Sequence, residues 1–291
     1  MKLDSSATSS SYQVPYIGLR PASMGSLPFA GVIMRPVHAM VVLGIVVLIG
    51  GAAYADIENL THFLRRAEEA THVTVAVRGD GEFAVQTPEA TRRNQVAMIV
   101  RPPADIFLAL RQERIKALLL GNDGHLLKTG AATAGPFHPA ATFAESDFTR
   151  EDLETFRLSR FKDWRISDES GTELTVMLVP QDSQYSLVVI TFDREKKVPL
   201  KTLYYRETLS NLVKMRRDEA FVFVGRMWMP GRTSMETFKL HTQTTFTMRW
   251  TEDSSLPSEL FDPAALPHAG IVWPPPPSVG PGKEKPGTSG G

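Results

Sequence analysis

Short runs with the residue alternation of β-strands follow one another along most of this 291-residue chain, and each ends at residues that favour turns. Runs of this kind, closed by Gly, Pro, Asn or Asp, are typical of strands that turn back beside their neighbours. The expected strands cover residues 95–100, 106–111, 115–120, 173–179, 185–192, 200–206, 212–217, 221–224, 233–240 and 244–251. The pattern predicts an antiparallel meander of about ten strands.

A further hairpin is expected where these runs begin. Valine alternates with other residues over residues 73–77, and the alternation resumes at residues 83–85 after Gly79-Asp80-Gly81. An Asp-Gly pair between two alternating runs predicts a β-hairpin turn. Residues 121–124, Gly-Asn-Asp-Gly, predict a second turn of this kind rather than a nucleotide-binding loop.

Two segments have helical rather than strand patterns. Residues 56–71 place Ile57, Leu60, Leu64 and Ala67 at the spacing of one helix face, which predicts an amphipathic helix that packs on an apolar surface. Thr149-Arg150-Glu151-Asp152 has the form of a capping box and predicts a short helix that begins after Thr149.

Two helices and one long meander predict an α+β fold that is mainly β, a curved antiparallel sheet whose concave side is closed by the helices. Some strands, such as residues 115–120 and 186–192, are apolar on both sides, whereas Phe246, Met248 and Trp250 alternate with polar residues. If the helices fill the concave side completely, it is only a core. If they fill it partly, a cavity of the size of a lipid chain remains.

Residues 34–55 have the organisation of an export signal, with Arg35 near the start, an apolar run, and Ala53-Tyr54-Ala55 at the exit. We expect cleavage between Ala55 and Asp56 and a periplasmic mature protein. The alternative is an uncleaved inner-membrane anchor whose N-terminal tail stays in the cytosol. Residues 1–33 precede the signal, and we interpret them as a mis-assigned start or a disordered extension.

The mature chain is expected to hold one domain, residues 56–267, followed by a disordered Pro/Gly-rich tail, residues 268–291. Without residues 1–55 the chain carries two more acidic than basic residues, so nothing attracts nucleic acid. It contains no cysteine. This excludes disulfides, Cys-ligated zinc, thiol nucleophiles and a lipid-modified Cys, and we expect a freely soluble mature protein.

Several short segments, in this order and spacing, resemble the LolA-like outer-membrane lipoprotein-sorting family and together cover most of residues 56–266. They are Pro102-Pro103-Ala104-Asp105-Ile106, residues 143–153 (Phe-Ala-Glu-Ser-Asp-Phe-Thr-Arg-Glu-Asp-Leu), residues 185–193 (Tyr-Ser-Leu-Val-Val-Ile-Thr-Phe-Asp), Val198-Pro199-Leu200-Lys201 leading to Tyr204-Tyr205, Trp228-Met229-Pro230 with Met235-Glu236 and Thr244-Thr245, and residues 256–261 (Leu-Pro-Ser-Glu-Leu-Phe).

The resemblance implies an unclosed β-barrel with a helical lid that is resident in the periplasm and shields acyl chains in transit. The chain departs from the family pattern after Tyr204-Tyr205, where a glycine turn is usual and residues 207–211 read Glu-Thr-Leu-Ser-Asn. This departure concerns the geometry of one hairpin and any partner contact there, not the fold.

The apolar residues of the expected concave face are the candidate ligand-binding residues. They are Val73, Val75, Val77, Leu108, Phe246, Met248 and Trp250, with Ile57, Leu60 and Leu64 on the lid helix. The competing interpretation is that this stripe is simply core, as most apolar stripes are.

Other candidate sites have weaker support. The histidines His62, His72, His125, His138, His241 and His268 are scattered without metal-ligand spacing, so we expect no metal site, and no nucleophile motif occurs. A catalytic carboxylate set could be imagined from Glu145, Asp147, Glu151 and Asp152. We favour a charged first helical turn instead. Arg92-Arg93 and Arg216-Arg217 could bind headgroups or an acidic partner, but we favour a solvated sheet edge.

These features predict a non-enzymatic, cofactor-free carrier, expected to be a monomer, that binds lipid or acylated lipoprotein and exchanges it with an inner-membrane transporter or exporter. The alternative is a non-enzymatic accessory subunit of an envelope exporter or assembly complex, whose sheet is fully packed and binds protein through an edge strand or the tail. An envelope hydrolase would need a nucleophile that the sequence does not show.

Overall fold

The computed structural model describes residues 59–253 and 255–273 of the chain. All of them belong to one of the two units into which the chain divides, Ala52–Gly291. The predicted export signal with its cleavage point, residues 1–33, the lid residue Ile57 and residues 274–291 lie outside the described residues.

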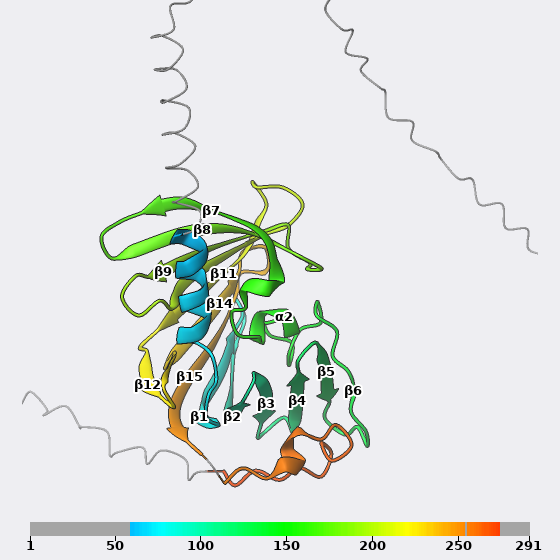
Figure 1. The fold of residues 1–291 in the computed structure, drawn as a ribbon. Coiled ribbons are helices and arrows are strands. Elements are labelled where there is room, and N and C mark those ends of the chain that lie inside the picture. Colours follow the sequence, from blue (N-terminus) through cyan, green and yellow to red (C-terminus); the bar gives the residue numbers. More distant parts are fainter. Residues whose placement is uncertain (1–58, 254, 274–291) are drawn as a thin grey trace, which may run out of the picture. The chain divides into compact units, whose positions relative to one another are not determined.

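One antiparallel sheet of 13 strands dominates the described residues (Figure 1). In spatial order its strands are β6 (Gly135–Pro136), β5 (Asp123–Leu127), β4 (Ile115–Leu120), β3 (Asp105–Leu110), β2 (Thr91–Arg101), β1 (Val77–Gln86), β15 (Thr242–Glu252), β14 (Arg232–Thr237), β11 (Leu212–Glu219), β10 (Pro199–Tyr205), β9 (Leu187–Asp193), β8 (Glu173–Pro180) and β7 (Phe161–Glu169). Because β6 and β7 do not pair, the sheet stays open. The predicted meander is confirmed, with β1 and β15 joined in its middle.

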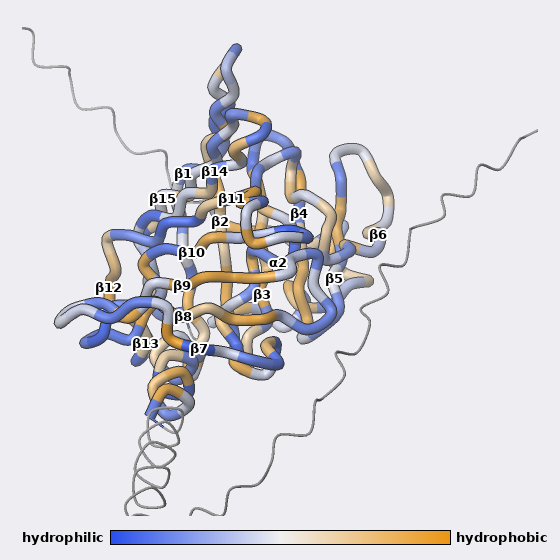
Figure 2. The backbone as a smooth tube through the Cα atoms, turned by 90° about the horizontal axis from the view of Figure 1, so that it is seen from above, coloured by the Kyte–Doolittle hydropathy of each residue, from blue (hydrophilic) through white to orange (hydrophobic). Residues whose placement is uncertain are grey.

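The sequence pattern missed strand β7, Phe161–Glu169. Most of its side chains are exposed, and two register shifts against β8 interrupt its alternation. Figure 2 shows the contrast, since β8 and β9 are largely hydrophobic and β7 is largely hydrophilic. An edge strand without a buried stripe gives little periodic signal.

The predicted hairpin turn at Gly79-Asp80-Gly81 is wrong, because these residues lie inside β1. The chain turns instead at residues 87–90, where the Thr87 amide donates to the carbonyl of Ala90. A Cβ atom on Gly81 would lie 1.8 Å from the Thr247 carbonyl oxygen of β15. The glycine is therefore required by the close approach of a neighbouring strand. The turn predicted within residues 121–124 is confirmed between β4 and β5.

Both predicted helices are present and pack on the same side of the sheet (Figure 1). The helix of residues 59–70 buries Leu60, Leu64 and Ala67 in the main core. Helix α2, Arg150–Leu153, begins at the predicted capping box of Thr149 and Asp152. Three 3₁₀ turns, Leu158–Arg160, Phe238–Leu240 and Ser258–Phe261, complete the described helical segments.

A second core lies on the outer face of β2 to β5, where residues of the C-terminal segment cover it. Leu260, Phe261 and Leu266 pack there against Ile99 and Phe107. This explains why the strands of this half are apolar on both sides. The packed chain continues to residue 273, where Trp273 still contacts this core.

The predicted sheet edge is wrong for Arg216 and Arg217, because β11 pairs with both β10 and β14 at these residues. Arg92 and Arg93 lie near the start of β2, where the strand pairs with β1 but extends beyond its ladder with β3, so they do border a local edge. Successive residues of a strand face opposite sides of the sheet. Arg216 accordingly reaches the concave side, whereas Arg217 is exposed.

The hairpin after Tyr204-Tyr205, where the sequence departs from the family pattern, turns without glycine. Glu207 takes a φ of 61° there, in the left-handed region that glycine normally occupies.

Candidate functional site

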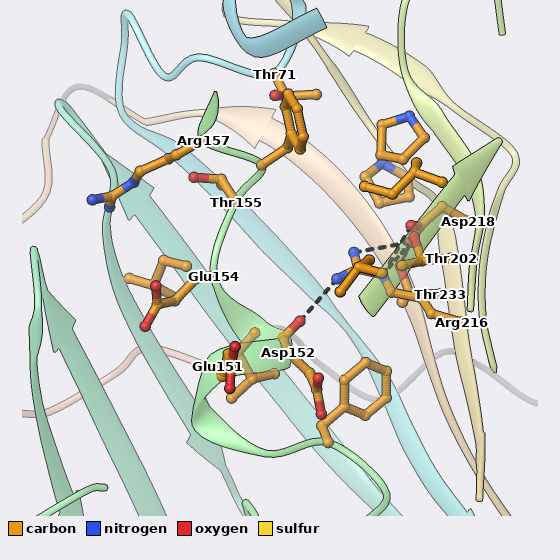
Figure 3. Close-up of a pocket in the computed structure, with 18 of the residues that line it drawn as sticks. Thr71, Glu151, Asp152, Glu154, Thr155, Arg157, Thr202, Arg216, Asp218 and Thr233 are labelled. Atoms are coloured by element: carbon orange, nitrogen blue, oxygen red, sulfur yellow. Dashed lines mark hydrogen bonds and ion pairs between the residues drawn. The ribbon is translucent and has the colours of Figure 1, made fainter. Parts of the chain in front are cut away.

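A cavity of about 190 Å³ lies on the concave side of the sheet, between the sheet and the segment of residues 151–161. Thr71, at the end of the first helix, also borders it (Figure 3). One water molecule needs about 10–15 Å³ of such space. The cavity therefore has room for on the order of a dozen groups of the size of a water molecule or a methylene. Neither helix fills the concave side completely.

Apolar side chains from distant parts of the sequence form most of the cavity wall. They are Met98, Val100, Ile106, Phe148, Leu153, Phe156, Phe161, Val188, Ile190, Trp228, Met229, Phe246, Met248 and Trp250. Their common position follows from the alternation of the strands, which directs every second residue of β2, β3, β9 and β15 to the concave face.

The structure brings together three of the candidate ligand-binding residues at the cavity, namely Phe246, Met248 and Trp250 of β15. Four others do not line it. Val73, Val77 and Leu108 are buried in the main core, and Val75 is half-buried beside Gly225.

The two described lid residues, Leu60 and Leu64, are buried beneath the first helix. The Phe63 and Phe192 rings pack in a T-shaped arrangement, with 5.7 Å between the ring centroids. This contact fixes the helix against β9.

A buried polar network beside the cavity was not predicted. Its centre is Asp152, whose carboxylate accepts hydrogen bonds from the Thr149 amide at 2.8 Å and the Tyr185 hydroxyl at 2.9 Å. The same carboxylate pairs with the Lys214 ammonium at 3.0 Å, and the two side chains are 0% and 8% exposed. Burial, and then the negative charge of Asp152, raise the pKa of Tyr185 above its ordinary value.

Arg216 reaches from β11 to helix α2 (Figure 3). Its guanidinium binds Asp218 at 2.8 Å and donates to the Asp152 carbonyl oxygen at 2.9 Å. Burial opposes the charged form, but the combined attraction of Asp218, Tyr204 and Asp152 outweighs it, so the pKa of Arg216 is raised. Asp218 also accepts a hydrogen bond from the Thr233 hydroxyl at 2.6 Å.

The charged first helical turn predicted for the acidic set is confirmed for Glu151 and Asp152, whereas Glu145 and Asp147 precede the helix. Glu151 and Asp152 do lie in the first turn of α2, but their side chains are 9% and 0% exposed. Asp147 is buried and accepts a hydrogen bond from Thr244 at 2.7 Å. Only Glu145 is exposed.

One sequence signal could have indicated the network. Lys214, Arg216 and Asp218 occupy alternate positions of one strand, where the concave face would otherwise be apolar. Charged residues on that face must find buried partners.

The cavity combines an apolar interior with polar groups along one side. In the described part of the chain, no group of three or more His, Asp or Glu residues is placed to hold a metal ion. Most of the carboxylates beside the cavity are held in ion pairs. The site is suited to an amphiphilic ligand whose apolar part enters the protein.

Comparison with known proteins agrees with this architecture. A family model described as that of an uncharacterized protein matches residues 137–268. No curated protein matches the sequence. A domain from Vibrio parahaemolyticus, provisionally named an outer membrane lipoprotein-sorting protein domain, superposes with a TM-score of 0.62 at 14% identity, over 69% of this chain and 95% of that one.

Two further solved structures are similar. A DUF1329 family protein from Desulfovibrio piger has a TM-score of 0.63 at 13% identity, over 71% of this chain and 97% of that one. A LolA superfamily protein from Nitrosomonas europaea has a TM-score of 0.54 at 15% identity, over 69% of this chain and 96% of that one. The described domain therefore has the LolA-like half-barrel fold, as the resemblance implied.

Proposed function

We propose that the protein is a periplasmic, non-covalent carrier of lipid or lipoprotein acyl chains. The single observation that carries this proposal is the apolar cavity of about 190 Å³ between the concave face of the sheet and its helical cover. The names of the similar structures, which include lipoprotein sorting, are consistent with it. The predicted export signal supports a location outside the inner membrane.

The energetics of burial are sufficient for binding without any bond chemistry. A methylene that leaves water for an apolar site contributes about 0.8 kcal/mol. Six buried methylenes would give roughly 5 kcal/mol before the loss of ligand and side-chain freedom is subtracted. This suits a transfer protein, which must bind its cargo and also release it. Release requires a partner or a conformational change that favours the empty state.

The cavity also bears on the alternative of an accessory subunit. That function requires a filled interior and an exposed edge strand, whereas the interior here is only partly filled. We therefore favour the carrier. Among the described residues, no helix is both long and apolar enough to cross a bilayer.

Native mass spectrometry of the protein purified from its own periplasm tests this proposal. We expect co-purifying lipid, and a consistently empty protein would contradict the carrier function. As a second measurement, Met98→Trp should fill the cavity and abolish displacement of a fluorescent acyl probe. Met215→Trp is the matched control, because Met215 is a half-buried residue on the opposite face of the sheet.

A further inference from the structure

The charges that border the cavity are balanced within the protein, with one exception. They belong to Glu151, Asp152, Glu154, Arg157, Arg160, Arg216 and Asp218. Asp152 pairs with Lys214, and Asp218 pairs with Arg216. Glu154 pairs with Arg160 at 2.8 Å and with Arg150 at 2.9 Å, and Glu151 lies 3.5 Å from Arg160. The Arg157 side chain makes no hydrogen bond or ion pair with any residue that the structure describes.

Arg157 is also placed differently from the other arginines of the site. It is half-buried, and it precedes the 3₁₀ turn Leu158–Arg160 that follows α2. Figure 3 shows it across the pocket from Arg216, on the side of Thr71 and Thr155. A half-buried guanidinium without a partner is costly unless an anion or water satisfies it. Its neighbour Phe156 belongs to the apolar wall.

The size of the cavity limits what can accompany that anion. Room for on the order of a dozen methylene-sized groups accommodates one acyl chain rather than several side by side. A ligand that satisfies both observations has a single hydrocarbon tail and one negatively charged head.

We propose that the cavity binds a single-chain anionic amphiphile, with the tail along the apolar wall and the carboxylate or phosphate head on Arg157. This inference rests on the proposed carrier function and names its ligand class. Arginine suits this role because its planar fork can donate two parallel hydrogen bonds to a carboxylate or a phosphate. A fatty acid and a lysophosphatidic acid share this chemistry.

Binding of three ligands with the same saturated chain tests the proposal: the fatty acid, the lysophosphatidic acid and the fatty alcohol. Titration is followed by the fluorescence of Trp228 and Trp250, which line the cavity. Wild-type protein should bind one or both anions about 10- to 100-fold more tightly than the alcohol, the usual range for losing a hydrogen bond to a charged group. The anion with the larger preference identifies the head group.

In Arg157→Gln this preference should disappear, while the affinity for the alcohol stays within about 2-fold. Arg217→Gln is the control, since Arg217 is exposed on the opposite face of the same sheet and should leave all three affinities unchanged. Thermal unfolding of both variants establishes that they fold.

The outcomes separate the two proposals. If wild-type protein binds none of the three ligands and also carries no co-purifying lipid, the carrier function itself fails. If it binds none of them but does carry lipid, the carrier function stands and the single-chain ligand class is refuted. If it binds the alcohol as tightly as the anions, or if Arg157→Gln keeps the preference for anions, the carrier function stands and the role of Arg157 is refuted.

Discussion

Replacement of Asp152 by alanine should destabilise the fold strongly. The substitution leaves the Lys214 ammonium, 8% exposed, without its carboxylate partner, and it removes the acceptor of the Thr149 amide and the Tyr185 hydroxyl. Removal of one member of a buried ion pair typically costs about 3–5 kcal/mol, because the remaining charge is uncompensated. We expect a loss of this size in the free energy of unfolding, and a fall in Tm of roughly 6–20 °C for a domain of this length.

Urea unfolding followed by far-UV circular dichroism measures this effect. Asp152→Ala combined with Lys214→Met should recover part of the loss, since no unpaired charge then remains, and the two substitutions should be non-additive by at least about 1 kcal/mol. Glu195→Ala, at an exposed side chain outside the network, should be nearly neutral. A loss below about 1 kcal/mol for Asp152→Ala, or strict additivity in the double variant, would refute the view that this pair anchors α2 to the sheet.

Three further predictions concern other parts of the fold. Gly81→Ala should prevent folding or cost more than about 3 kcal/mol in urea unfolding, because its Cβ would clash with β15, whereas Gly171→Ala meets open space and should be nearly neutral. Phe261→Ala should lower the free energy of unfolding by about 3–5 kcal/mol but leave ligand binding intact, because this ring packs on the outer face. A folded variant that has lost affinity for the ligand would contradict this. Burial raises the pKa of Tyr185 and of Tyr204, so the unfolded chain loses these protons first as the pH rises through about 10. The contribution of the two tyrosines to stability is constant below that pH and should then fall by about 1.4 kcal/mol per pH unit for each tyrosine. Tyr204→Phe should therefore reduce the slope in urea titrations from pH 9 to 11, and an unchanged slope would contradict the raised pKa of Tyr204.

The antiparallel sheet could be predicted because its signal is local. Alternation and turn residues lie within a few positions of each other, so β3, β4 and β8 were located to within one or two residues. The error at Gly79-Asp80-Gly81 has the opposite cause. These glycines are explained by a strand that passes beside them and that comes more than 150 residues later in the chain.

The candidate site could be predicted only in part, because some of its contacts also join residues that are far apart in the sequence. The alternation in β15 indicated Phe246, Met248 and Trp250, which do line the cavity. Nothing near Asp152 indicates that Lys214 lies opposite it, because the two residues meet only when β11 takes its place in the sheet. Partners of buried charges are determined by tertiary structure, and a single sequence does not identify them.

The pairing of β1 with β15 also has a consequence for the order of assembly. The ladder joins Val77 to Glu252 and Gln86 to Gln243, so the first and last strands of the sheet lie at its centre. A chain made from its N-terminus can form the hairpins of β1 to β5 early, but the two halves remain unconnected until β15 has emerged. Contacts of such long sequence separation slow folding. The concave surface therefore cannot be complete before β15 has been synthesised, and a nascent chain that ends before this strand lacks the part of the cavity wall formed by Phe246, Met248 and Trp250.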